Sequence, residues 1–194
     1  MFFRPAFLLL CTLAATSARE PPVVYLIRHG EKPADPEDHG LTPDGWRRAE
    51  CLRRVFGADS EYNIGHIMAP TVKWNLKLTF ANVVDGEHRR PYETVVPLAH
   101  DLGIEIDDHC TRKDPECVAA AIQSHDGPGN LLISWRHSNL NTIQELLGIE
   151  HLVDYPRDRF DLIWTIPHPY NEITEVYSEE CPGLDVRPRL VAQL

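Results

Sequence analysis

The stretch VVYLIRHGE, residues 23–31, decides the fold of this chain, and it has a counterpart in NLLISWRH, residues 130–137. In each stretch an apolar run leads directly into an Arg-His pair, Arg28-His29 in the first and Arg136-His137 in the second. Short apolar runs are typical of buried strands, and in open α/β sheets ligands bind at the carboxyl ends of the strands. We therefore expect the two imidazoles and an arginine to meet in one crevice, which suits an anion and a histidine nucleophile.

Further motifs accompany these two stretches. Residues 41–49 read Leu-Thr-x-x-Gly-x-x-x-Ala, and Arg90 lies four residues before Thr94. Together with Arg28-His29-Gly30 and His137, and in this order, they resemble the histidine phosphatase superfamily, which has the phosphoglycerate-mutase-like fold. The resemblance covers residues 23–148, and the C-terminal tail is similar to that of small secreted-type fungal members.

The resemblance implies a phosphatase that hydrolyses a small phosphorylated substrate without a metal ion or other cofactor. It makes His29 the nucleophile, which carries the phosphoryl group until water releases it. Arg28 and Arg90 bind the phosphate oxygens, since planar guanidinium groups match phosphate better than an ammonium group does. His137 donates to charge that grows in the transition state. Glu31 either binds substrate or only fixes the loop that follows His29.

Two assignments stay open at the level of sequence. Arg89 is the alternative second phosphate ligand, although the spacing to Thr94 favours Arg90. The general acid is also open, because relatives often place Glu directly before the second His, where this chain has Arg136. Arg136 is either an additional phosphate-side cation or a solvent-facing residue. The candidate acids are Asp107, Asp108, Asp114 and Glu116.

The open acid keeps two other functions in consideration. Without an acid, activated phosphoesters and acid anhydrides still react, because their leaving groups need less protonation. A phosphoglycerate-mutase-like phosphotransferase would need a closed site, and this short chain lacks an obvious cap. A pseudoenzyme that only binds a phosphate ligand would explain a missing acid. The other histidines, His88 and His109 among them, are interpreted as structural or solvent-exposed.

Alternating strand and helix patterns predict an α/β fold, a three-layer α/β/α sandwich with a mostly parallel central sheet. Thr42 is expected to cap a helix that starts at Pro43. The expected apolar face of that helix is Trp46, Ala49, Leu52 and Phe56. The arginines expected to face solvent are Arg47, Arg48, Arg53 and Arg54.

Two further predictions concern a helix cap and an insertion. Ser138 or Asn139 is expected to cap the helix that follows the second Arg-His pair. The roughly twenty residues between Ala69-Pro70 and Arg90 are expected to form an insertion over the mouth of the site, where they would influence substrate choice.

Length and charge limit the function. A chain of 194 residues with 43% hydrophobic and 25% charged residues is typical of one soluble domain, expected over residues 19–194. The net charge of -10 argues against a nucleic-acid partner, which needs a basic face. It does not argue against a small phosphorylated substrate, because local arginines set the field of a cleft. The sequence does not predict the oligomeric state.

The N-terminal residues 1–18 are expected to be a secretory signal peptide. Arg4 gives a basic start, residues 6–15 are apolar, and small residues follow at 16–18. This apolar stretch is too short to cross a bilayer, which needs about 20 residues. We therefore expect a secreted protein without a stable membrane span; an uncleaved anchor or leader is the alternative.

The cysteines agree with secretion. Without Cys11, an even set of Cys51, Cys110, Cys117 and Cys181 remains, which allows three pairings. Cys110 and Cys117 flank the turn at Asp114-Pro115 and are near enough to bridge locally, which leaves Cys51 for Cys181. The alternative is four free or buried thiols. Zinc-binding spacings are missing from the sequence.

Overall fold

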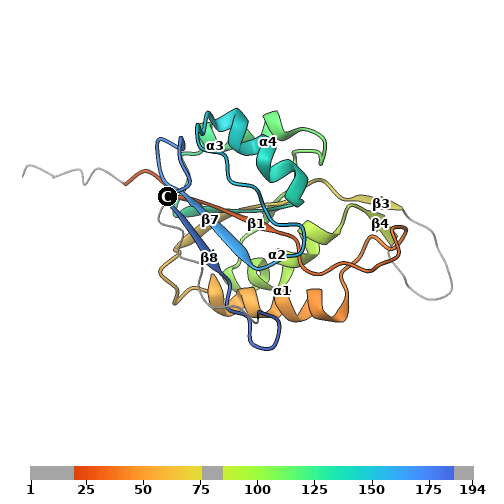
Figure 1. The fold of residues 1–194 in the computed structure, drawn as a ribbon. Helices are drawn as coiled ribbons and strands as arrows, with labels where there is room; N and C mark the ends of the chain where they lie inside the picture. Colours follow the sequence, from red (N-terminus) through yellow and green to blue (C-terminus); the bar gives the residue numbers. More distant parts are fainter. Residues whose placement is uncertain (1–19, 76–84, 186–194) are drawn as a thin grey trace, which may run out of the picture.

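The computed structural model describes residues 20–75 and 85–185, so the predicted signal peptide lies outside the described residues. Strand β1 (Val24–Arg28) is buried at all five positions because it lies inside a six-stranded sheet. Figure 1 shows this sheet at the centre of the molecule. The strands, in sheet order, are β5 (Ile106–Asp107), β2 (Ile64–Met68), β6 (Asn130–Trp135), β1, β7 (Leu162–Ile166) and β8 (Glu175–Ser178).

The sheet is mostly parallel, as predicted. Strand β1 pairs in parallel with β6, β6 with β2, and β2 with β5. Strand β7 is antiparallel to β1 and to β8, so it alone among these strands runs the other way. The carboxyl ends of β1 and β6 therefore lie at the same edge of the sheet.

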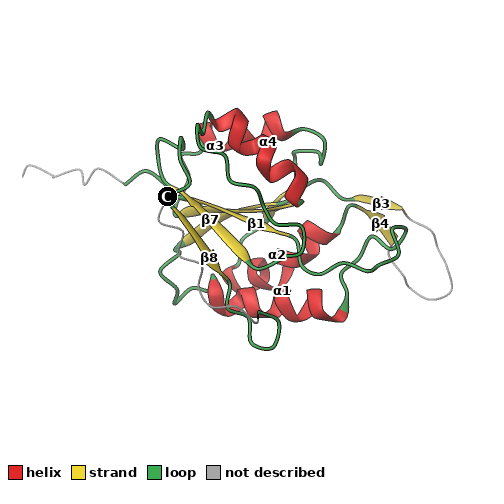
Figure 2. Ribbon diagram, in the orientation of Figure 1, coloured by secondary structure: helices red, strands yellow, loops and turns green. Residues whose placement is uncertain are grey.

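The helices cover both faces of the sheet (Figure 2). They are α1 (Pro43–Val55), α2 (Arg90–Leu102), α3 (Pro115–Ser124) and α4 (His137–Leu147). Alternate residues of β1 supply both layers, because successive strand side chains point to opposite faces. Val24 and Leu26 pack in the cluster that contains residues of α3 and α4, whereas Tyr25 and Ile27 pack with residues of α1 and α2. The predicted three-layer sandwich is confirmed.

Helix α1 begins as predicted, but two of its side chains do not face the predicted way. The side chain of Thr42 accepts a hydrogen bond from the Gly45 amide at 3.1 Å, and Pro43 is the first helical residue. Trp46, however, is 42% exposed, whereas Arg48 is only 2% exposed. The predicted solvent-facing position of Arg48 was wrong because carboxylates from distant segments surround it, as described below.

The predicted cap of α4 was also wrong. The helix begins at His137, with Arg136 at the cap position and no side-chain cap. Ser138 and Asn139 already lie inside the first turn, so neither caps it. The Asn139 side chain donates instead to the carbonyl oxygen of Arg112, at 3.1 Å.

The predicted insertion contains a small hairpin. Strands β3 (Lys73–Asn75) and β4 (Asp85–Glu87) pair antiparallel and form a sheet of their own, apart from the central one (Figure 1). The residues between them lie outside the described residues. Helix α2 starts shortly after β4, so the hairpin leads directly to Arg90.

Two disulfides confirm the predicted pairing. Cys51 is bonded to Cys181, and Cys110 to Cys117. The first joins α1 to the C-terminal segment, and the second closes the loop before α3. In the part of the chain that the structure describes, no helix is long and apolar enough to cross a membrane.

Candidate active site

The ends of β1 and β6 meet, as the repeated Arg-His pair predicts. The main-chain amide of His29 donates to the carbonyl oxygen of Trp135 at 3.0 Å, which holds the residue after β1 beside the end of β6. A cavity of about 110 Å³ opens at this edge of the sheet, and we call it the cationic cavity. It is lined by Arg28, His29, Lys32, His88, Arg90, Pro91, Arg112, Arg136 and His137.

The imidazole of His29 is buried, and its tautomer follows from one contact. Its Nδ1 lies 2.7 Å from the carbonyl oxygen of Gly30, which only accepts hydrogen bonds, so Nδ1 carries the proton and Nε2 the lone pair. Burial lowers the pKa of His29 to about 3, and the charges of Arg28 and Arg90 add to this effect. At neutral pH, His29 is therefore a neutral imidazole with a nucleophilic nitrogen.

The loop after His29 is held by two of the sequence motifs. The Gly30 amide donates to Thr94 Oγ1 at 2.9 Å, and this hydroxyl donates to the carbonyl oxygen of Arg90 at 2.7 Å. A Cβ on Gly30 would lie 3.0 Å from the main-chain oxygen of Gly45, at the start of α1. Thr94, four residues after Arg90, and the two glycines therefore position the loop after His29.

Arg28 is fixed without any ligand. It is 2% exposed, and its Nη1 donates to the carbonyl oxygens of Arg157 and Arg159 at 2.9 and 2.6 Å. Its guanidinium carbon lies 3.8 Å from the ring centroid of Phe160. Such a stack orients the planar group and leaves its other nitrogens for the cavity.

The structure distinguishes the two adjacent arginines at the start of α2. Arg90 lines the cationic cavity, whereas Arg89 does not. The Nε of Arg89 lies 3.0 Å from Glu93 Oε1, and Asp38 lies 3.8 Å from Arg89 Nη2. This arrangement favours Arg90 as the phosphate ligand.

His137 lines the cavity as the first residue of α4, two residues after the end of β6. Burial lowers its pKa, and nearby Arg28 and Arg136 lower it further. Since the amino end of a helix carries partial positive charge, α4 adds to the positive field of the cavity.

Glu31 points away from the cationic cavity. Both its carboxylate oxygens accept from Arg48, the closest contact being 2.6 Å. Arg48 also binds Glu179 and Asp185, at 2.6 and 2.8 Å. We call these four residues the Arg48 cluster. The structure thus places Glu31 as a residue that fixes the loop and does not bring it to the candidate phosphate ligands.

None of the four candidate acids lines the cationic cavity. Asp107 binds His66 and His109, and its pKa is lowered by these hydrogen bonds although burial acts to raise it. The side chain of Asp114 caps α3 by accepting from the Cys117 amide at 3.0 Å. In the described residues, no carboxylate of any kind lines the cavity.

Three residues that line the cavity belong to no sequence motif: Lys32, His88 and Arg112. Arg112 lies in the loop closed by the disulfide Cys110–Cys117. Basic residues in a short loop between two cysteines are the sequence signal that could have identified Arg112. His88 follows the hairpin strand β4, in the segment predicted to be an insertion over the site.

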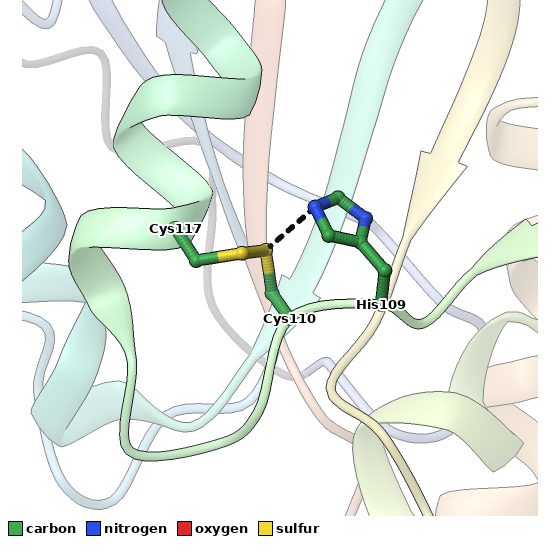
Figure 3. Close-up of side chains that lie close together, drawn as sticks. All are labelled: His109, Cys110 and Cys117. Atoms are coloured by element: carbon green, nitrogen blue, oxygen red, sulfur yellow. Dashed lines mark hydrogen bonds between the residues drawn. A yellow bond between two sulfur atoms is a disulfide. The ribbon is translucent and has the colours of Figure 1, made fainter.

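Two groups of possible metal ligands lie outside the cavity. The first is His109 with Cys110 and Cys117, and the second is Cys181 with carboxylates of the Arg48 cluster. Figure 3 shows the first group, in which His109 Nε2 lies 3.2 Å from Cys110 Sγ. In both groups the sulfur belongs to a disulfide and is not a thiolate, so neither forms a complete ligand set as it stands.

No family model and no curated protein sequence matches the chain. Solved structures do resemble it. The SixA protein of Agrobacterium tumefaciens is 16% identical with a TM-score of 0.51, and the alignment covers 81% of this chain and 98% of SixA. The protein histidine phosphatase SixA complexed with tungstate is 15% identical with a TM-score of 0.51, over 81% and 97% of the two chains. The chain therefore has the histidine phosphatase fold that its motifs predict.

Proposed function

We propose that this protein is a metal-independent phosphatase that hydrolyses a small phosphorylated substrate through a phosphohistidine on His29. The observation that carries the proposal is the state of His29, a neutral imidazole with Nε2 unprotonated in a cavity lined by arginines. The histidine phosphatase fold supports it, as does the name of one structure with this fold, a protein histidine phosphatase bound to the oxyanion tungstate.

In the proposed reaction His29 Nε2 attacks phosphorus, the N–P bond forms and the bond to the leaving oxygen breaks. Arg28 and Arg90 bind the phosphoryl oxygens, and His137 stabilises the charge that develops there. Such positioning matters most in phosphoryl transfer, where the protein has little covalent chemistry to do. Water then attacks the phosphohistidine and releases inorganic phosphate. Arg28 is already held by two carbonyl groups and a ring stack, so it needs no reorganisation.

The test is rapid-quench mass spectrometry of the protein mixed with 4-nitrophenyl phosphate. We expect an acid-labile adduct of one phosphoryl group on His29, together with multiple turnovers. The variant His29→Ala should lose both and keep its fold. The matched control is His100→Ala, because the His100 side chain is 88% exposed and lies on α2 away from the cavity. Turnover that survives in His29→Ala would mean that another group is the nucleophile.

Two other functions predict different results in the same experiment. A phosphotransferase would form the adduct but would release phosphate to water slowly unless an acceptor alcohol is added. A phosphate-binding pseudoenzyme is favoured by the lack of a carboxylate among the described residues that line the cavity. It would form no adduct, and phosphate would stabilise wild type and His29→Ala alike against heating.

We also infer that the protein is secreted. The two disulfides are compatible with an extracellular protein, since such bonds persist in oxidising compartments. Mass spectrometry of protein from a secreting host tests the predicted cleavage after residue 18. A mature chain that still begins at Met1 would contradict it.

A further inference from the structure

The cationic cavity holds more positive charge than one phosphoryl group needs. Its permanently charged side chains are Arg28, Lys32, Arg90, Arg112 and Arg136. Among the described residues, none of these five forms a salt bridge. A phosphoryl dianion carries at most two charges, which two arginines beside the nucleophile already match.

The surplus charge is not compensated by the protein. Arg136 lowers the pKa of Arg90 and of Arg112, in addition to burial, so these groups repel one another. Glu87 influences Arg112 from nearby, and Asp38 influences Arg90, yet neither lines the cavity. Like charges collected in this way favour an anion of high charge.

Buried donors at the cavity also lack acceptors. The Nε atoms of Arg28 and Arg112 are buried, and no hydrogen-bond partner is present for them in the described part of the chain. A buried donor without a partner is unfavourable until an acceptor arrives. Two separate arginines, one beside His29 and one in the disulfide loop, therefore each have a buried N–H group to which a ligand oxygen could bind.

Arg112 and Arg136 are held in fixed relation to each other. The Asn139 side chain donates to the carbonyl oxygen of Arg112 at 3.1 Å, and Asn139 lies in the first turn of α4, which Arg136 precedes. The disulfide Cys110–Cys117, drawn in Figure 3, closes a loop, and Arg112 belongs to this loop by its position in the sequence. These contacts hold the main chain at both residues, so the two cations start from fixed positions at the cavity.

We propose that Arg112, Arg136 and Lys32 form a second anion subsite, and that the substrate is a phosphoanhydride. Its terminal phosphoryl group would lie at His29, and its inner phosphate would bind the second subsite. This inference rests on the phosphatase function proposed above and names the substrate class.

The lack of an acid agrees with this substrate class. An alkoxide leaving group needs a proton from a general acid, whereas the phosphate that leaves a phosphoanhydride is stable as an anion at neutral pH. His29 Nε2 forms the N–P bond, the anhydride P–O bond breaks, and its electron pair stays on the bridging oxygen. Arg112 and Arg136 neutralise that oxygen. Water then hydrolyses the phosphohistidine, so one diphosphate and one water yield a monophosphate and inorganic phosphate.

The test compares kcat/KM for ADP with kcat/KM for 4-nitrophenyl phosphate. We expect wild type to prefer ADP, and we expect Arg112→Ala and Arg136→Ala each to lower the ADP-to-aryl-phosphate ratio about 10- to 100-fold, the effect of one charge-assisted hydrogen bond. The matched control is Lys113→Ala, which removes a charge from the exposed neighbour of Arg112 in the same loop. It should leave the ratio unchanged.

The outcomes separate this inference from the proposed function. Turnover of the aryl phosphate with a ratio that neither arginine variant alters would overturn the second subsite and leave the phosphatase standing. No turnover of either compound would contradict the phosphatase itself. Thermal unfolding of each variant shows whether it is folded, and the two arginines test the subsite independently.

A comparison of diphosphates that carry different groups on the inner phosphate identifies what the subsite recognises. Inorganic pyrophosphate, ADP and geranyl diphosphate share the anhydride and differ in everything else. Similar kcat/KM values for all three would support recognition of the diphosphate unit. Hydrolysis of one of them alone, with a ratio that Arg112→Ala does not change, would overturn the role of the inner phosphate.

Discussion

The Arg48 cluster and the cationic cavity both include residues of the loop after His29, and they differ in how their charged side chains are paired. In the cluster, one arginine faces the three carboxylates of Glu31, Glu179 and Asp185. In the cavity, five cations line the space and no described carboxylate joins them. Each carboxylate of the cluster contacts Arg48, whereas the five cations of the cavity form no salt bridge among the described residues. The difference separates an arginine that is paired within the fold from arginines that we propose bind a ligand.

The loop after His29 connects the two regions. His29 lines the cavity, and Glu31, two residues later, binds Arg48. The Arg48 cluster also ties the C-terminal segment to α1, and the disulfide Cys51–Cys181 joins the same two segments. The cluster therefore holds the loop after His29 through Glu31.

The largest expected effect is on the folded state, from Arg48→Ala. Removing one partner of a buried ion pair leaves uncompensated charge, so we expect a loss of about 3–5 kcal/mol in the free energy of unfolding. Urea denaturation with the disulfides intact measures it. The control is Arg47→Ala, whose ion pair with Asp44 is exposed and whose effect should stay below about 1 kcal/mol. Equal effects of both substitutions would mean that the cluster contributes nothing beyond a surface pair.

In the cavity, Arg90→Ala should lower kcat/KM for an aryl phosphate by about 100- to 1,000-fold, with little change in stability. The reason is the loss of a donor that is already in place for the phosphoryl oxygens. Arg89→Ala is the control because Arg89 is paired with Glu93 and does not line the cavity. Steady-state kinetics of both variants settle the choice, and a larger loss in Arg89→Ala would transfer the role to that residue.

This contrast also shows what the sequence can predict. The meeting of His29 and His137 follows from local patterns, because strand ends in a parallel sheet share an edge. The cap at Thr42 and the four-residue spacing from Arg90 to Thr94 are equally local, and both appear in the structure. Local periodicity and short spacing therefore account for the fold and for the centre of the site.

The burial of Arg48 was beyond such reasoning. Its carboxylate partners Glu179 and Asp185 come from the other end of the chain. Arg112 and His88 reach the cavity by the same kind of long-range contact, through a disulfide loop and a hairpin. Contacts between distant segments leave no periodic pattern in the sequence. The residues around the site therefore could not be predicted from the sequence.

Removal of the Cys110–Cys117 disulfide is expected to have a smaller effect on the region of the cavity. In the chain-entropy estimate, a loop this short contributes about 2.5 kcal/mol to stability. We expect Cys110→Ser/Cys117→Ser to lose about this amount and to lower the ADP-to-aryl-phosphate ratio, because the loop that carries Arg112 is no longer closed. Denaturation and kinetics of the same preparation measure both. A loss of stability with an unchanged ratio would mean that the contact from Asn139 alone positions Arg112.

The smallest expected effect is a pH dependence that separates the two regions. Burial raises the pKa of Glu179 to about 8 even though Arg48 acts to lower it, since three carboxylates share that arginine. The folded state then holds a proton that the unfolded chain releases above its ordinary pKa of about 4.5. The contribution of Glu179 to stability is therefore full below about pH 4.5 and is lost as the pH rises through about 8.

Substitution at this position isolates the contribution. We expect Glu179→Gln to remove this decline in the free energy of unfolding between about pH 5 and 8. Glu50→Gln is the control, because the Glu50 side chain is 57% exposed and pairs only at the surface with Arg53. Denaturation at several pH values compares the slopes. Equal slopes in wild type and Glu179→Gln would show that Glu179 is ionised in the fold, so that Arg48 outweighs burial and the cluster holds three full negative charges against one positive.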